Sequence, residues 1–212
     1  MRFSKEEIQE ALCLRHTHEI QERLDRGRVA VAGLGGLGSF VAVALARIGV
    51  GHLHLIDHDQ VDLTNLNRQQ YFIRHVGMYK TDALREQLLE INPYLDIRTD
   101  CVRVREENIR ELFAEDDIIC EAFDVPESKA MLVNGVLGQF EEKKIVSASG
   151  MAGYGNSNAI RTRKITDRFY LCGDEVSDSR NGLGLMAPRV GICAGHEANL
   201  IVQLLIDGGA ER

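Results

Sequence analysis

The chain has 212 residues, of which 44% are hydrophobic and 27% are charged, so it is long enough to bury a sizeable core. Lys and Arg total 25 against 32 Asp and Glu, a net charge of -7, and no basic run of the kind that binds a phosphate backbone is present. No apolar stretch approaches the roughly 20 residues that cross a bilayer, and the charged start is unlike a signal peptide. We therefore expect a cytoplasmic protein with no nucleic-acid or membrane partner.

The cysteines are odd in number and widely spaced, and no two of them form a C-x-x-C pair. Paired cysteines at short spacing are typical of zinc sites, and an even number is typical of a disulfide framework. The pattern predicts free thiols in a reducing compartment and no structural zinc. The cysteines are Cys13, Cys101, Cys120, Cys172 and Cys193.

The chain begins with a polar stretch whose apolar residues recur at helical spacing. A helix is expected over residues 5–25, and we assign residues 1–27 to an N-terminal helical extension. After residue 27 the residue pattern changes to short apolar runs separated by glycine. A strand, a glycine turn, a helix and a second strand are expected at 28–32, 33–38, 39–48 and 52–56.

Strands and helices continue to alternate after this first βαβ unit. Further strands are expected at 97–104, 117–122, 144–148, 159–165 and 169–171. Further helices are expected at 81–91, 107–113, 127–140 and 188–206. This order predicts an α/β fold with a Rossmann-like, doubly wound, mostly parallel sheet and a smaller antiparallel C-terminal portion, in which residues 28–212 form a single domain.

The glycine turn predicts a nucleotide site. Glycine at positions 33, 35 and 38 permits a tight turn and close approach of the backbone to a phosphate, and the following helix offers free N–H groups. Asp57 ends the second strand, where a carboxylate accepts hydrogen bonds from a ribose. These features alone leave open whether the nucleotide is a dinucleotide or ATP.

Two cations after the second strand favour a triphosphate. A bridging pyrophosphate is largely satisfied by a helix N-terminus, whereas ATP carries about four negative charges and needs cations or a metal. Arg68 and Lys80 are therefore expected to clamp the phosphates, the alternative being that both are ordinary surface charges. Asp124 follows another strand at the same rim and is expected to hold Mg²⁺, although it could instead cap the next helix.

Four segments carry a resemblance to a known family. They are Gly33-Leu34-Gly35-Gly36-Leu37-Gly38-Ser39, Asp57-His58-Asp59, Asn65-Leu66-Asn67-Arg68-Gln69 and Gly77-x-x-Lys80. Together they resemble the ThiF/MoeB/ubiquitin-activating (E1-like) superfamily. The resemblance covers residues 28–150, and the stretch at 151–155 with Arg161-x-Arg163 is similar to short ThiF-type proteins of the bacterial thiamine pathway.

The resemblance implies adenylation of the C-terminal glycine of a ubiquitin-like, ThiS-like sulfur carrier, with ATP and Mg²⁺ and release of pyrophosphate. It implies a nucleotide site made of Gly33, Gly35, Gly36, Gly38, Asp57, Asp59, Asn65, Arg68 and Lys80. It also implies catalytic roles for Arg68, Lys80, Asp124 as the magnesium ligand, and Arg15.

Arg15 matches the family's N-terminal arginine, which reaches the phosphates of the neighbouring subunit, and this favours a homodimer; a solvated helix face explains Arg15 as well. The chain departs from the family pattern in three places. It lacks the zinc-binding cysteine pairs, it has Val125 where relatives often carry Asn, and only Cys172 lies near the segment where some relatives form a covalent link with the carrier.

Three other functions remain open. An NAD-dependent oxidoreductase would explain the glycine turn and Asp57, but no side-chain set that handles a hydride is evident. A relative that activates a tRNA-linked carboxylate is disfavoured by the acidic charge. A non-catalytic ATP-binding adaptor would leave the phosphate and metal residues without a purpose.

Overall fold

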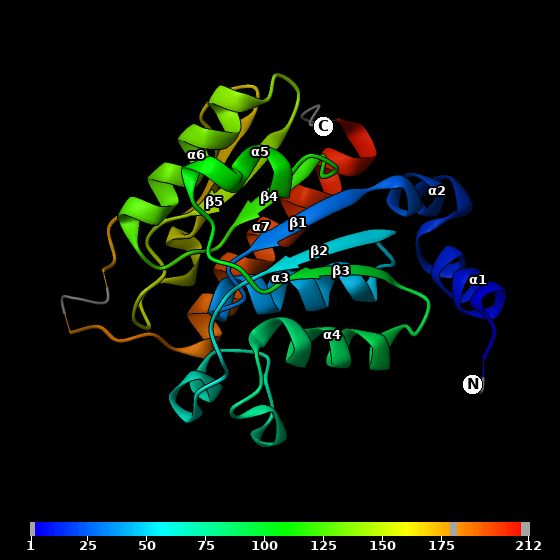
Figure 1. Cartoon of the computed structure of the whole chain (residues 1–212), viewed down its shortest axis with the longest axis horizontal. Helices are drawn as coiled ribbons and strands as arrows, with labels where there is room; N and C mark the ends of the chain where they lie inside the picture. The colour runs from blue at the N-terminus through cyan, green and yellow to red at the C-terminus, as the bar shows by residue number, and fades with distance from the viewer. Residues whose placement is uncertain (1–2, 179–181, 209–212) are drawn as a thin grey trace.

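The computed structural model describes residues 3–178 and 182–208. The fold is built on one seven-stranded sheet with the strand order β3-β2-β1-β4-β5-β7-β6 (Figure 1). The strands are β1 Arg28–Ala32, β2 His52–Ile56, β3 Asp96–Asp100, β4 Ile118–Glu121, β5 Lys144–Ala148, β6 Arg161–Lys164 and β7 Phe169–Gly173. Five of the six pairings are parallel, and β6 runs antiparallel to β7. The predicted Rossmann-like α/β fold is confirmed.

Helices cover both faces of the sheet. One layer contains α3, α4 and α7, and the other contains α5 and α6 (Figure 1). The α-helices are α1 Lys5–His16, α2 His18–Arg26, α3 Gly36–Arg47, α4 Lys80–Ile91, α5 Ile109–Leu112, α6 Pro126–Gln139 and α7 Ala187–Asp207.

The near-continuous apolar runs of the central strands follow from this sandwich. In β1, Val29 and Val31 belong to the core cluster under α3 and α7, whereas Ala30 and Ala32 belong to the cluster under α5 and α6. All four side chains are 0% exposed. Strands that are covered on both faces need apolar side chains at every position rather than at alternate ones.

The prediction of one helix over residues 5–25 is wrong, because the chain breaks at Thr17. The backbone of Thr17 has φ 77°, a value that non-glycine residues seldom adopt. Its N–H bonds to the carbonyl of Cys13 at the end of α1, and its hydroxyl accepts from the N–H of Ile20 at the start of α2. One threonine therefore ends the first helix and caps the second.

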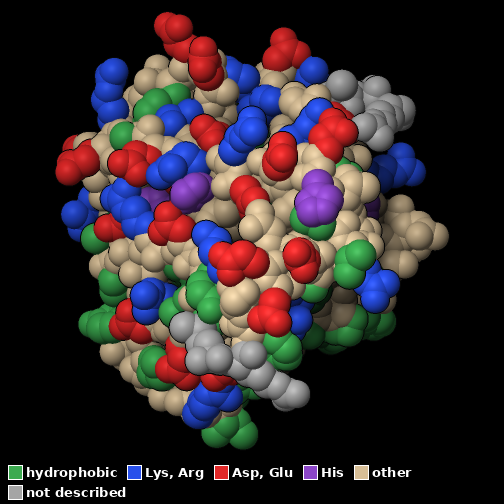
Figure 2. Space-filling view, turned by 90° about the vertical axis from the view of Figure 1, so that its right-hand side faces the viewer, with side chains coloured by type: hydrophobic (Ala, Val, Ile, Leu, Met, Phe, Trp, Pro, Cys, Tyr) green, Lys and Arg blue, Asp and Glu red, His purple; other side chains and the backbone are tan. Residues whose placement is uncertain are grey.

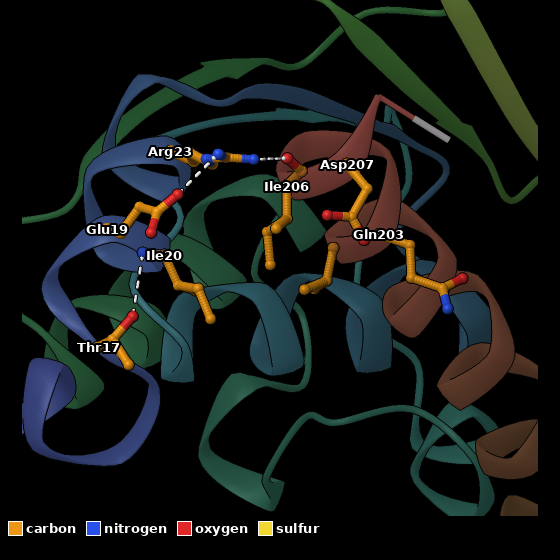
Figure 3. Close-up of a pocket in the computed structure, with 8 residues that line it drawn as sticks. Thr17, Glu19, Ile20, Arg23, Gln203, Ile206 and Asp207 are labelled. Carbon is orange, nitrogen blue, oxygen red and sulfur yellow. Dashed lines mark hydrogen bonds and ion pairs between the residues drawn. The ribbon is translucent and has the colours of Figure 1, made fainter. Parts of the chain in front are cut away.

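The α2 helix packs against the C-terminal end of α7 (Figure 3). Arg23 forms an ion pair with Glu19 at 2.9 Å and donates to the carbonyl of Ile206. These residues line a cavity of about 290 Å³. Leu24 of α2 is 1% exposed and lies in the main core. The division into an extension (1–27) and a domain (28–212) stays a prediction.

Two other elements are shorter than expected. The strand predicted at 97–104 ends at Asp100, because β3 pairs with β2 alone and β2 supplies five residues, His52–Ile56. The helix predicted at 107–113 is a 3₁₀ turn, Glu106–Asn108, followed by the four residues of α5. The other predicted elements are present. The strands predicted at 28–32, 52–56 and 144–148 have the predicted ends, and the ends of the remaining elements move by up to a few residues.

The face that bears α1 and α2 shows acidic and basic side chains interspersed over its surface (Figure 2). Within the described part of the chain, no helix combines the length and the apolar character that a membrane span requires.

Candidate functional site

The glycine turn joins β1 to α3 and requires glycine at two positions. Gly33 has φ 92°, and a Cβ there would lie 2.8 Å from the carbonyl oxygen of Ala122. A Cβ on Gly38 would lie 1.8 Å from the carbonyl oxygen of Gly33. The helix starts at Gly36 with Gly35 as its N-cap, and no side chain caps it. Its first N–H groups are therefore available to an anion, as the sequence predicts.

Asp57 holds the end of β2 against this turn. One of its carboxylate oxygens accepts from the N–H of Leu34 at 2.7 Å, and the other accepts from the N–H of Asp59 at 2.8 Å. The residue is 8% exposed. A carboxylate offers about four acceptor positions, so these two bonds leave capacity for a ribose hydroxyl.

Lys80, the first residue of α4, lies at the same rim and is 7% exposed. Its ammonium is 2.8 Å from Asp59 and 3.6 Å from Asp57. Burial acts to raise the pKa of Asp59, but the hydrogen bond and charge of Lys80 outweigh it and lower that pKa. The structure thus brings Lys80, Asp57 and Asp59 together. The Lys80 ammonium is already removed from water, so a phosphate that replaced the Asp59 carboxylate would not have to desolvate it.

Arg68 follows a 3₁₀ helix, Leu63–Asn67, whose first turn is closed by Asn65. Asn65 is a predicted phosphate ligand, but its side-chain oxygen accepts a hydrogen bond from the N–H of Asp62 at 3.1 Å. That oxygen therefore stabilises the turn. The Arg68 guanidinium donates to the side chain of Asn67 at 2.8 Å, a neutral partner. A Cβ on Gly36 would lie 3.5 Å from the Arg68 side chain, which places Arg68 beside the start of α3. Within residues 3–178 and 182–208, no carboxylate pairs with its charge.

Asp124 lies in the loop between β4 and α6. It is exposed, and within the described residues its carboxylate has no hydrogen bond or ion pair. The N-cap of α6 is Val125, so the alternative that Asp124 caps this helix is wrong. The loop touches the glycine turn through Gly33 and Ala122. A carboxylate without a partner among the described residues, next to the glycine turn, fits Mg²⁺, which takes one or two protein carboxylates and completes its shell with phosphate and water.

Arg15 is not brought to these residues within one chain. It is exposed on α1, which lies beside α2 at one end of the sheet (Figure 1). A Cβ on Gly49, in the turn that leads into β2, would lie 2.6 Å from Leu12 of the same helix. Since β1 and β2 are parallel, this end is opposite to the glycine turn that follows β1.

Three site-region residues were not predicted. Gln69 is 8% exposed, lies beside Gly35, and its side-chain oxygen has no hydrogen-bond partner in the part of the chain that the structure describes. Its position directly after Arg68 was the available signal. Glu121 and Lys129 form an ion pair at 2.7 Å behind the Asp124 loop. A charged residue at the end of the apolar strand β4 was the signal for that pair.

The structure does not favour a covalent role for the cysteines near the last helix. Cys172 is 0% exposed, and burial raises its pKa to about 12. Burial also raises the pKa of Cys193 well above its usual range. Since the thiolate is the nucleophile, both side chains are present as unreactive thiols in this conformation.

Comparison with known proteins finds a matching family and relatives of similar sequence. The model of the ThiF family matches residues 9–211. The adenylyltransferase and sulfurtransferase UBA4 of Candida glabrata is 32% identical over 179 residues, which are 81% of this chain and 41% of that protein. The tRNA threonylcarbamoyladenosine dehydratase of Bacillus subtilis is 42% identical over 93 residues, which are 43% of this chain and 37% of that protein. The chain thus spans less than half the length of these relatives.

Solved structures extend the similarity of fold over the whole chain. The dehydratase TcdA of E. coli, in complex with ATP, has a TM-score of 0.86 at 20% identity and covers 98% of both chains. MccB of E. coli has a TM-score of 0.70 at 24% identity and covers 89% of this chain and 59% of that chain. At these identities the similarity concerns the fold.

Proposed function

Because the chain belongs to the ThiF family, we propose that it uses ATP and Mg²⁺ to adenylate a carboxylate and release pyrophosphate. The substrate we propose is the C-terminal glycine of a ubiquitin-like, ThiS-like sulfur carrier, for the synthesis of the thiamine thiazole in the cytoplasm. The contact that carries the proposal joins the glycine turn to the loop between β4 and α6, which contains Asp124. In this contact Gly33 lies against Ala122, two residues before Asp124.

The reaction needs charge cancellation rather than a general base. A C-terminal carboxylate has a pKa of about 3.5 and is ionised at neutral pH, so it can attack the α-phosphorus without losing a proton. It approaches a triphosphate that carries about four negative charges, and the two repel each other. Mg²⁺, when bound, would neutralise part of the phosphate charge, and Asp124 is the residue we assign to hold it.

Lys80 and Arg68 supply the remaining positive charge. When a triphosphate binds, Lys80 exchanges its contact with Asp59 for a phosphate oxygen, and Arg68 exchanges its contact with Asn67. Asp57 then keeps the turn closed through the N–H of Leu34 and accepts from the ribose. The N–H groups at the start of α3 face the phosphates and need no reorganisation during the reaction.

We place the carrier's tail along residues 151–156, which follow β5 at the same rim. Hydrogen bonds from Gly153 and Arg189 hold the backbone of this loop. The N–H of Gly153 donates to the carbonyl of Gly184 at 2.9 Å, and Arg189 donates to the carbonyl of Gly155 at 3.0 Å. A slim, glycine-rich tail can enter such a loop as an extended strand. A bulky residue in place of Gly153 is expected to block carrier adenylation and leave ATP binding intact.

A second candidate substrate is a carboxylate carried by tRNA. The 42% identity to the Bacillus subtilis dehydratase over 93 residues favours it. The net charge of -7 opposes it, because affinity for a nucleic acid depends largely on cations that neutralise its phosphates. The longer match, which covers 81% of this chain, is to the adenylyltransferase and sulfurtransferase UBA4, and this name agrees with adenylation and with sulfur chemistry.

ATP–pyrophosphate exchange separates the candidates. The account predicts exchange that depends on Mg²⁺ and on a carrier that ends in glycine, and no exchange with a carrier that lacks its last glycine. Exchange with a carboxylate-bearing tRNA in place of the carrier would overturn the proposed substrate and keep the adenylation. Protection against thermal unfolding by NAD but not by ATP would overturn the adenylation itself.

A further inference from the structure

The last residue of β4 is a glutamate that the structure buries completely. Glu121 is 0% exposed although it is charged. Carboxylates are rarely buried without partners, because a buried charge loses its favourable hydration and one hydrogen bond does not compensate for that loss. Glu121 has partners from three separate segments of the chain. They are the backbone N–H of Phe123, the ammonium of Lys129 and the hydroxyl of Ser147.

Glu121 and Lys129 both bind the backbone of one loop residue, Phe123. Glu121 accepts from the N–H of Phe123 at 2.7 Å, and its other oxygen lies 2.7 Å from the Lys129 ammonium. The same ammonium donates to the carbonyl of Phe123 at 3.1 Å. One ion pair therefore holds both backbone polar groups of Phe123, the residue directly before Asp124.

The glycine turn holds the loop from its other side. The N–H of Ala122 donates to the carbonyl of Ala32 at 2.8 Å, and the carbonyl of Ala122 lies against Gly33. Asp124 itself is exposed and has no side-chain partner among the described residues. The position of its carboxylate is thus set by the backbone that precedes it.

We propose that Glu121 and Lys129 are positioning residues, which hold Asp124 where it binds the magnesium of the nucleotide complex. The inference rests on the proposed function, because it takes Asp124 as the magnesium ligand. Residues behind a metal ligand change metal affinity by about 10–100-fold when they are removed. Breaking the ion pair frees the Phe123 peptide and weakens the contribution of Mg²⁺ to ATP binding, although neither residue touches the nucleotide.

Calorimetric titration of ATP tests this role without any turnover. The affinity is measured once with Mg²⁺ and once with EDTA, and the ratio of the two gives the contribution of the metal. Lys129→Met and Glu121→Gln are expected to lower this ratio about tenfold or more, whereas Lys129→Arg, which keeps the cation, retains most of it. Glu121→Gln removes the charge that holds the Lys129 ammonium beside the carbonyl of Phe123, and it keeps an acceptor for the Phe123 N–H. It therefore serves if Lys129→Met does not fold.

The matched control is Lys143→Met. Lys143 also donates to backbone carbonyls, those of Ala114 and Asp116, but it does so at the opposite end of the sheet, before β5. The control is expected to lower the melting temperature and leave the ratio unchanged. A wild-type ratio in folded Lys129→Met and Glu121→Gln would overturn the positioning role.

A double-mutant cycle with Asp124→Asn separates positioning from general damage. If Lys129 acts through Asp124, Lys129→Met lowers the ratio in the wild-type background and adds no further loss in the Asp124→Asn background. An equal further loss in that background would contradict the inference and leave the proposed function intact. A wild-type ratio in Asp124→Asn alone would overturn the magnesium assignment, and the positioning role with it.

Discussion

The Lys80 ammonium lies 2.8 Å from a carboxylate oxygen of Asp59. The cation that we propose as a phosphate ligand is therefore held as an ion pair at the rim of the sheet. Lys80→Met is expected to weaken ATP binding by about 10–100-fold, since a hydrogen bond to a charged group is worth about 1.5–3 kcal/mol. Adenosine, which carries no phosphate, should lose far less, and titration of both ligands measures the difference. Equal losses for ATP and adenosine would contradict the phosphate role.

Asp124→Asn and Arg68→Ala are each expected to lower ATP–pyrophosphate exchange by at least about 10²-fold, the scale of losing one preorganised electrostatic group. Asp124→Asn should leave the melting temperature unchanged, because the side chain is exposed and has no partner among the described residues. Asp117→Asn is the control, an exposed aspartate at the other end of β4. Exchange at the wild-type rate in either site variant would remove that residue from the mechanism.

The glycine turn gives a prediction about stability. Gly38→Ala places a Cβ 1.8 Å from the carbonyl oxygen of Gly33 and is expected to cost about 1–3 kcal/mol and abolish ATP binding. Gly138→Ala is the control: it lies within α6 with no atom near the added Cβ, so it should stabilise the protein by up to about 1 kcal/mol. Urea unfolding compares the two. Unchanged stability in Gly38→Ala would show that the turn differs from the one described.

Glu197 predicts a dependence of stability on pH. It is 0% exposed on α7, one of its oxygens has no hydrogen-bond partner among the residues described, and burial raises its pKa well above 4.5. The folded state therefore keeps a proton that the unfolded state releases, so stability falls as pH rises from about 4.5 towards the folded pKa. Glu197→Gln, which cannot ionise, should gain stability relative to wild type between pH 5 and pH 8, as measured by urea unfolding at several pH values in about this range. Identical pH profiles would contradict a buried, protonated Glu197.

Arg15 predicts complementation between subunits. If Arg15 completes the site of a neighbouring subunit, Arg15→Ala and Asp124→Asn are each inactive alone. Mixing and re-associating them should restore about a quarter of the wild-type exchange rate, because half of the dimers are mixed and each has one intact site. No recovery on mixing would place Arg15 outside the neighbouring site, and full activity of Arg15→Ala would remove it from the mechanism.

Local patterns in the sequence predicted the parts of the fold that depend on local chemistry. The apolar run of β1, the glycines that follow it and Asp57 all lie within one βαβ unit, so their spacing alone indicates a nucleotide site. The break at Thr17 was missed because the residues on both sides of it are helical, and a positive φ at threonine leaves no mark in composition.

Contacts between segments that are distant in the sequence could not be predicted from local residue patterns. Glu121 and Ser147 lie 26 residues apart and meet only because β4 and β5 are neighbours in the sheet. The end of β3 likewise depends on the length of its partner strand, β2, rather than on its own apolar residues. Register and strand order decide such features, and both are set by the packed sheet.

The central claim is that this rim activates the terminal carboxylate of a carrier protein with ATP. Intact-mass spectrometry of a ThiS-like carrier, incubated with the protein, ATP and Mg²⁺, tests it directly. The account predicts a carrier heavier by one adenylyl group, formed by the wild type and absent with Asp124→Asn. A carrier of unchanged mass, with ATP bound and the protein folded, would contradict it.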